Sequence, residues 1–222
     1  MIWLSVIFSS LLLAGVTTHV TVTDPGSKRQ DNSGVVLWLE PVGGTVPGGI
    51  GQPSSMLHKN KTFVPHVIAI RTGTKVLFPN RDPFFHNAFS NYDGQVFDIG
   101  LHAPGTTREF TFKRPGIVRV FCNIHPTMSA VIVVVDTPYF AVSDAAGTLA
   151  LPDVPAGEYR MHVFHERVAP AALRTLERSV SLPGTIPPLT LSAAGSLETP
   201  HLNKLGKPYP AVIKDQYPDP LR

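Results

Sequence analysis

Three side chains that can bind a metal lie within seven consecutive residues: Cys122, His125 and Met128. Cys122 is the only cysteine among the 222 residues. Thiolate and thioether are soft ligands. A cysteine and two histidines in one plane, with a long and weak bond to a methionine, describe a blue-copper electron-transfer centre rather than a tetrahedral zinc site. The spacing therefore predicts most of a copper site, which needs one more imidazole from elsewhere in the chain.

His86 is the candidate for that imidazole. It lies upstream of Cys122 in a segment that includes Phe84, Phe85 and Phe89. Aromatic neighbours exclude water from a metal and so tune its reduction potential. Phe84 and Phe85 are interpreted mainly as core or rim packing, and the docking of a redox partner is the alternative role.

The elements that must position these residues are predicted to be β-strands. The chain contains 22 Pro and 18 Gly and no convincing helical period. Its apolar runs, such as 67–70, 117–121 and 131–135, are short and rich in β-branched residues. The cysteine loop therefore lies between two strands, so the scaffold rather than the metal would position the ligands. The net charge is only +3, and scattered basic residues exclude a nucleic-acid footprint.

The first 18 residues resemble a secretory signal in length and apolar character. The apolar run is shorter than the roughly 20 residues that a transmembrane helix needs, and an uncleaved anchor is the alternative. The sequence therefore predicts a periplasmic or secreted protein with no transmembrane segment after cleavage. In that oxidising compartment, metal ligation explains a single unpaired cysteine.

The central part of the chain holds a series of short motifs: Phe63-Val64-Pro65, residues 73–78, Asn80, His86-Asn87, Pro115-Gly116 and Cys122-x2-His125-x2-Met128. In order and spacing, this series resembles the plastocyanin-type cupredoxins. The last spacing is similar to the short ligand loop of amicyanin. This resemblance implies a Greek-key sandwich over residues 54–136 that binds one type 1 copper per chain, with the ligands His86, Cys122, His125 and Met128. It also implies support of the ligands by Asn87, Asn80 and Pro126, and electron passage through His125.

A second resemblance, to the transthyretin-like fold of carboxypeptidase regulatory domains, rests on the segments 144–151 and 155–159. Residues 139–191 hold too few strands for a complete sandwich. We therefore expect a discontinuous second β-sandwich made of residues 19–42 and 137–192, with the cupredoxin inserted and residues 193–222 forming an extended or disordered tail. The alternative is that the N-terminal strands complete the cupredoxin itself.

The predicted function is electron transfer between a redox donor and a redox acceptor, without enzymatic activity. Four protein ligands leave no open position for a substrate, and no hydrolase or phosphate-binding motif is present. A resemblance to methylamine-utilisation-like proteins, through residues 123–126 and 137–140, points to a respiratory or amine-oxidation chain. The alternatives are a non-redox copper chaperone or storage protein and a structural β-protein of the cell envelope. The oligomeric state is left open.

The other histidines are expected to be unremarkable in position. His19, His58, His66 and His102 are interpreted as surface or edge residues, and alternation along 158–164 places His162 in solvent. A second metal site that combines His165 with His162 or His201 is not favoured, because no spacing supports it.

Overall fold

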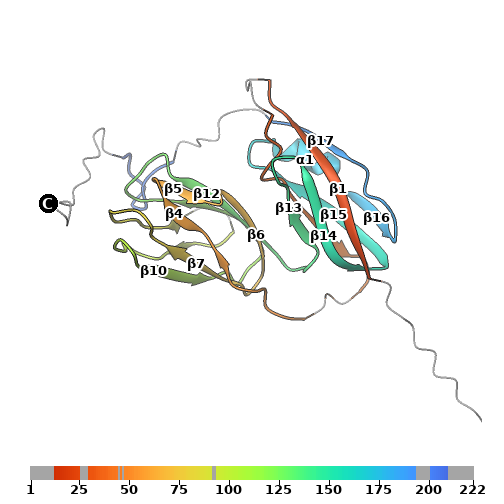
Figure 1. Ribbon diagram of the computed structural model, residues 1–222, viewed down its shortest axis with the longest axis horizontal. Helices are drawn as coiled ribbons and strands as arrows, with labels where there is room; N and C mark the ends of the chain where they lie inside the picture. Colours follow the sequence, from red (N-terminus) through yellow and green to blue (C-terminus); the bar gives the residue numbers. More distant parts are fainter. Residues whose placement is uncertain are drawn as a thin grey trace, which may run out of the picture.

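The computed structural model describes residues 13–25, 30–44, 46, 48–91, 94–193 and 201–209. These residues form two β-sandwiches that lie side by side (Figure 1). The prediction of an all-β protein with two sandwiches is confirmed. No helix in this part of the chain is long and apolar enough to cross a membrane.

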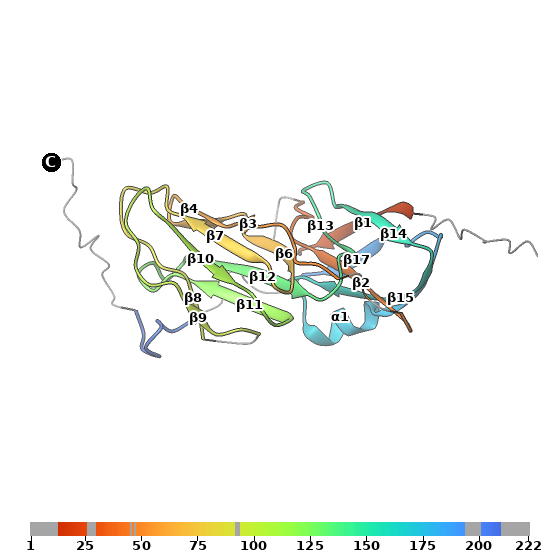
Figure 2. The same cartoon turned by 90° about the horizontal axis from the view of Figure 1, so that it is seen from below.

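Sandwich I is formed by the central part of the chain. Its strands are β3 (Ser54–Ser55), β4 (Leu57–Lys59), β5 (Thr62–Val64), β6 (Val67–Arg71), β7 (Lys75–Pro79), β8 (Phe89–Ser90), β9 (Phe97–Asp98), β10 (Thr107–Thr111), β11 (Gly116–Phe121) and β12 (Ser129–Val135). One sheet has the order β6-β12-β11-β8-β9, a second has the order β10-β7-β3, and β4 and β5 pair as a separate two-stranded sheet (Figure 2). Apolar side chains from these sheets fill one core, because alternate residues of each strand point inward.

Sandwich II combines the two ends of the chain. Its elements are β1 (Leu13–Thr23), β2 (Val36–Pro41), β13 (Phe140–Val142), β14 (Thr148–Pro155), β15 (Gly157–Phe164), α1 (Pro170–Leu176), β16 (Arg178–Leu182) and β17 (Leu189–Ser192). The sheets have the orders β14-β1-β17 and β13-β2-β15-β16. Leu37 of β2 pairs with Val163 of β15, so an N-terminal strand and a C-terminal strand share one sheet.

Strand β1 begins at Leu13, inside the stretch that was expected to be a signal peptide. Val16 pairs with Leu151 and is 5% exposed in the core of sandwich II. Residues 1–12 lie outside the described residues, and the signal peptide stays a prediction. The helix α1 was not expected from the sequence. Pro170 is favourable at its start, because the N–H groups of the first turn have no acceptor within the helix and proline lacks this group.

Strand β12 is buried on both faces and joins the two sandwiches. Ala130, Ile132 and Val134 point into the core of sandwich I. The intervening valines, at 131, 133 and 135, pack with Val36 of β2 in a separate apolar cluster between the sandwiches. A strand that is covered on both sides needs a continuous apolar sequence rather than an alternating one, which explains the unbroken run Val131 to Val135.

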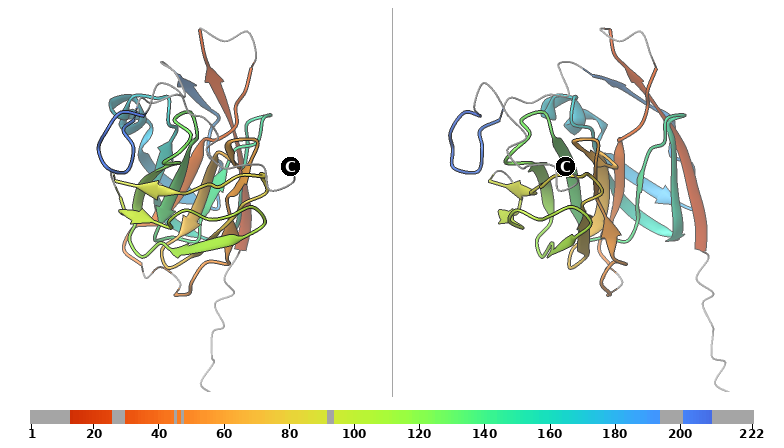
Figure 3. Two further views of the ribbon diagram at one scale, coloured as in Figure 1. Left: turned by 90° about the vertical axis from the view of Figure 1, so that its left-hand side faces the viewer. Right: turned by 60° about the vertical axis from the view of Figure 1, so that its left-hand side comes forward.

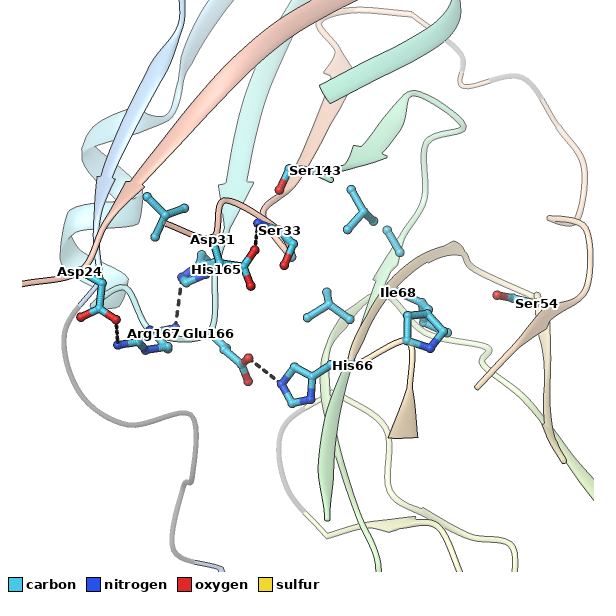
Figure 4. Close-up of a pocket in the computed structure, with 16 residues that line it drawn as sticks. Asp24, Asp31, Ser33, Ser54, His66, Ile68, Ser143, His165, Glu166 and Arg167 are labelled. Carbon is cyan, nitrogen blue, oxygen red and sulfur yellow. Dashed lines mark hydrogen bonds and ion pairs between the residues drawn. The ribbon is translucent and has the colours of Figure 1, made fainter. Parts of the chain in front are cut away.

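A polar contact and a cavity lie at the same boundary. His66, before β6, contacts Glu166, after β15, with 2.6 Å between Nε2 and Oε1 (Figure 4). The adjoining cavity has a volume of about 620 Å³ and is lined in part by Asp24, Asp31 and His165. Arg167 turns away to Asp24, at 2.7 Å. His66 and Glu166 therefore link the two sandwiches directly.

This link gives the stability of the protein a pH dependence of known sign. The hydrogen bond that the Glu166 carboxylate accepts from the His66 ring raises the pKa of His66 above its ordinary 6.5. A raised folded-state pKa stabilises the fold fully below 6.5, and this stabilisation is lost as the pH rises through the raised value. We expect the thermal unfolding midpoint to fall as the pH rises above 6.5, and Glu166→Gln to weaken this dependence.

A matched control is Glu158→Gln, because Glu158 is exposed on β15. This variant should keep the wild-type pH profile. An unchanged profile in Glu166→Gln would show that the link adds nothing to the stability.

Candidate metal centre

The cysteine loop is held tightly between β11 and β12. Phe121 and Ser129 form the last pair of the ladder. Beyond it, the Cys122 N–H donates to the Met128 carbonyl at 3.1 Å, and the Met128 N–H donates to the His125 carbonyl at 3.0 Å. These bonds fold the loop back on itself. Its three candidate ligands are all buried: Cys122 and Met128 are 0% exposed and His125 is 5% exposed.

His86 is brought to the same point by the segment that leads into β8. Its backbone pairs with His102 through two hydrogen bonds, of 3.2 and 2.9 Å. The Cys122 Sγ lies 3.9 Å from the His86 Nδ1 and 3.6 Å from the His125 Nδ1. One donor atom from each of these three residues lies within 4.8 Å of the others. Within the described ranges, this is the group of at least three His, Cys, Asp or Glu side chains that could hold a metal ion.

This donor set fits a soft transition metal. Metal–sulfur and metal–nitrogen bonds of about 2.0–2.3 Å would place the donors several ångströms apart around one ion. Met128 packs in the same core cluster as Cys122, and its carbonyl accepts the Cys122 N–H at 3.1 Å. A His2Cys set with a nearby methionine is the donor combination of blue-copper sites.

Burial sets the protonation state of the thiol. It raises the pKa of Cys122 above the usual 9.0, and the backbone N–H groups of Ile124, Asn87 and His125 oppose this rise. Without a metal, the thiol is therefore protonated at neutral pH. Metal binding must displace this proton, because the thiolate is the ligand.

Asp82, a residue that no sequence pattern indicated, contacts the His86 ring on the side away from Cys122. Its Oδ2 lies 2.8 Å from the His86 Nε2, and the two groups are 5% and 0% exposed. Burial acts to raise the pKa of Asp82, but the N–H groups of Lys61 and Asn60 and the His86 ring lower it below 3.8. An ionised carboxylate only accepts hydrogen bonds, so the His86 Nε2 carries the proton, and the Nδ1, which faces the Cys122 Sγ, is the nitrogen that could bind a metal.

Asn87 and Asn80 connect the loops around the centre. The Asn87 Oδ1 accepts the Asn123 N–H at 3.0 Å, and the Asn87 Nδ2 donates to Asp98 at 2.6 Å. The Asn80 Nδ2 donates to the Phe84 carbonyl at 2.8 Å, and the Asn80 Oδ1 accepts the Asp82 N–H at 3.0 Å. Asn87 thus joins the two ligand loops, and Asn80 shapes the segment before His86. Pro126 is exposed on the cysteine loop.

Phe84 covers both imidazoles. Its ring centroid lies 5.2 Å from that of His86 and 5.5 Å from that of His125. The Lys61 ammonium lies 5.0 Å from the centroid of the same ring, in a cation–π contact. Phe84 and Phe85 are both half-buried. Phe84 therefore forms part of the rim above the candidate ligands.

The interpretation of His58 and His102 as surface or edge residues is wrong. They are 0% and 2% exposed, and their rings lie 4.9 Å apart. The His58 ring lies 5.1 Å from that of His86. Burial lowers the pKa of His58 to about 2, and it also lowers that of His102. Both imidazoles are therefore neutral at physiological pH, and His58 packs behind the candidate ligand His86.

His58 is expected to reduce the stability of the fold. Within the described part of the chain, neither ring nitrogen of His58 has a hydrogen-bond partner. A buried polar group without a partner costs about 1–3 kcal/mol. His58→Leu should therefore raise the free energy of unfolding of the metal-free protein by about that amount in urea denaturation. His19→Leu, at an exposed position on β1, should change it by less than about 0.5 kcal/mol. A less stable His58→Leu protein would contradict this account.

The remaining histidines lie elsewhere. The His162 ring stacks on Trp38 at 5.0 Å in sandwich II, and its side chain is 16% exposed, so it is less solvated than expected. His165 lines the boundary cavity, and the His201 ring stacks on Phe121 at 4.0 Å. None of these three belongs to the group of described residues that could hold a metal ion.

The comparison of sequences gives one partial relative. No family model matches the chain. The methylamine utilization protein MauL of Methylorubrum extorquens is 39% identical over 57 residues, which are 25% of this chain and 50% of MauL. The match therefore spans half the length of this curated relative.

Similar solved structures are copper proteins. The copper-containing nitrite reductase of Thermus scotoductus is 28% identical, with a TM-score of 0.36, over 43% of this chain and 25% of that one. The purple cupredoxin of Nitrosopumilus maritimus is 23% identical, with a TM-score of 0.34, over 37% of this chain and 99% of that one. A reduced amicyanin variant is 18% identical, with a TM-score of 0.35, over 36% of this chain and 80% of that one. The chain is thus similar to MauL and to cupredoxins over part of its length, and the transthyretin-like resemblance stays a prediction.

Proposed function

We propose that the protein is a type 1 copper protein that carries single electrons and binds one copper per chain. The observation that carries this proposal is the buried group formed by Cys122, His86 and His125, with donor atoms within 4.8 Å of one another. Met128 is proposed as the weak axial ligand, since it is fully buried and its backbone is hydrogen-bonded to that of Cys122. Bound copper would supply a one-electron redox couple, and four protein ligands would leave no place for a substrate.

The contribution of the protein is rigidity and exclusion of water. The short loop and the Asp82 contact position the donors before any metal arrives. A site that changes little between two oxidation states transfers electrons readily, because little reorganisation is needed. His125 is 5% exposed whereas His86 and Cys122 are 0% exposed. This difference supports His125 as the ligand through which electrons pass.

The partners are proposed to be a redox donor and a redox acceptor outside the cytoplasm. Phe84 and Phe85 form the half-buried rim on which they would dock. The name of the relative MauL supports a role in methylamine oxidation or a related chain. We further propose that residues 19–42 and 137–192 form one transthyretin-like domain, which surrounds the cupredoxin of residues 54–136 and serves as a platform for attachment.

Titration of the purified protein with Cu(II) tests the proposed function. An electron carrier should take up one equivalent of copper, develop an intense visible absorption from thiolate-to-copper charge transfer and undergo reversible reduction. A copper chaperone or storage protein should give weakly coloured copper that a chelator removes readily. A structural β-protein should bind none. Either of the last two outcomes would overturn the proposal.

Replacement of Met128 should show whether this residue is a weak axial ligand or a strong equatorial one. Met128→Leu keeps an apolar side chain of similar size but removes the thioether, and axial ligands tune the potential of blue-copper sites. We expect the charge-transfer colour to remain and the reduction potential to rise, as measured by redox titration. Loss of copper binding in this variant would contradict a weak axial role.

A further inference from the structure

Residues 201–209, here called the strap, lie against sandwich I beside β8 and β9. Figure 3 shows the strap as a dark blue loop outside the strands. The Asn91 Nδ2 donates to the Lys204 carbonyl at 3.0 Å, and the Lys204 Nζ contacts Asp98 of β9 at 2.7 Å. The strap has its own turn, because the Asn203 side chain accepts the N–H groups of Leu205 and Lys207. It is therefore a folded piece of chain with specific contacts.

The strap contacts three consecutive residues where the cysteine loop begins. The His201 ring stacks on the Phe121 ring, with centroids 4.0 Å apart and planes 21° apart. The Tyr209 hydroxyl donates to the Cys122 carbonyl at 2.7 Å. The third contact is the Lys204 N–H, which donates to the Asn123 Oδ1 at 2.9 Å. The Cys122 carbonyl and the side chains of its two neighbours are thus contacted by a segment about 80 residues further along the chain.

These contacts close a ring of hydrogen bonds with the groups that brace the ligand loops. Asp98 accepts from Lys204 through one oxygen and from the Asn87 Nδ2 through the other. Asn87 in turn accepts the Asn123 N–H, and Asn123 accepts the Lys204 N–H. Burial acts to raise the pKa of Asp98, but the bond from Lys204 and its other donors lower it below 3.8. The strap therefore shares an ionised carboxylate with the link between the two ligand loops.

We propose that the strap positions the Cys122 ligand, with Tyr209 as the positioning residue. Orientation of the Cys122 thiol depends on its backbone, and Tyr209 fixes that backbone through the carbonyl. The His201 ring supports Tyr209, since its Nε2 lies 3.1 Å from the Tyr209 hydroxyl. The role in a metal site rests on the proposed function, whereas the restraint on the loop is a property of the metal-free chain.

The first test uses the thiol itself. Cys122 is the only cysteine of the chain, so alkylation by iodoacetamide in the metal-free protein reports its accessibility by mass. Removal of one hydrogen bond should increase local opening about fivefold. Tyr209→Phe should therefore be alkylated about fivefold faster than the wild type, and a chain that ends at residue 200 faster still.

The control is Tyr159→Phe, because the Tyr159 hydroxyl also donates to a backbone carbonyl, that of Pro155, at 2.8 Å in sandwich II. It should be alkylated at the wild-type rate. Wild-type rates in both Tyr209→Phe and the shortened chain would overturn the proposal.

The second test uses the copper-loaded protein. Tyr209→Phe should shift the charge-transfer band and the reduction potential, and Tyr159→Phe should shift neither. Faster alkylation with an unchanged charge-transfer band and reduction potential would mean that the strap only shields the Cys122 thiol from solvent. This result would overturn the positioning role. If the wild type forms no coloured copper site, the proposed function fails, while the alkylation rates still decide whether the strap restrains the loop.

Discussion

Replacing Cys122 by alanine is expected to abolish the thiolate-to-copper absorption completely. Cys122 is the only cysteine of the chain, so no other thiolate can replace it. Two imidazole donors would remain, His86 and His125, and a soft thiolate is what favours copper at such a site. Titration of Cys122→Ala with Cu(II), followed by visible absorption and chelator competition, should show no intense band and weaker binding.

His86→Ala should also remove the band, since it deletes one of the three donors that lie within 4.8 Å. His162→Ala is the matched control, because His162 is an imidazole in sandwich II that contacts Glu40 instead of the cluster. Urea unfolding of the metal-free variants should show that each still folds. A full-strength band in Cys122→Ala would mean that the colour does not come from the proposed site.

Local sequence predicted the parts of the site that lie close together along the chain. Cys122, His125 and Met128 lie close together in the structure, because a short loop between two strands leaves its backbone little conformational freedom. The β-branched runs predicted the strands for a similar reason: each run is complete within one element. The run from Val131 to Val135 also carried a signal of burial on both faces, although its second partner, β2, is about 90 residues away.

Long-range contacts account for what the sequence did not reveal. His58 is buried because β4 and β5 form a hairpin and because Asn80 bridges to it. His102 is buried because it pairs with His86. Neither contact produces a pattern in the neighbouring sequence, so a buried histidine cannot be distinguished from an exposed one by its sequence neighbours. The strap is a further example of a long-range contact. Its sequence predicted part of an extended or disordered tail, and only the fold shows that it contacts the cysteine loop.

Asp82 is the missed residue with the largest expected effect. It lies four residues before His86, a spacing that has no fixed meaning outside a helix. In the structure, its two oxygens accept the N–H groups of Asn60 and Lys61, at 2.6 and 2.9 Å, as well as contacting the His86 Nε2. The carboxylate therefore anchors the turn between β4 and β5 and selects the tautomer of a proposed ligand.

Asp82→Ala is expected to weaken both the fold and the metal site. The buried His86 Nε2 and the backbone N–H groups of Asn60 and Lys61 would lose their acceptor. A buried donor left without a partner costs about 1–3 kcal/mol of unfolding free energy. Loss of the carboxylate that orients a ligating histidine typically lowers metal affinity about 10–100-fold. Urea unfolding of the metal-free protein measures the first effect, and competition with a chelator for Cu(I) measures the second.

Asp82→Asn separates these two effects. Its single amide oxygen can replace Oδ2, which serves both Lys61 and His86, so metal affinity should recover more than stability does. Asp136→Ala is the control, because Asp136 is exposed at the end of β12, and it should change stability by about 0.5 kcal/mol or less. If Asp82→Ala kept the wild-type copper affinity, His86 would be oriented by its backbone pair with His102 alone, and the carboxylate would act only as an anchor for the turn.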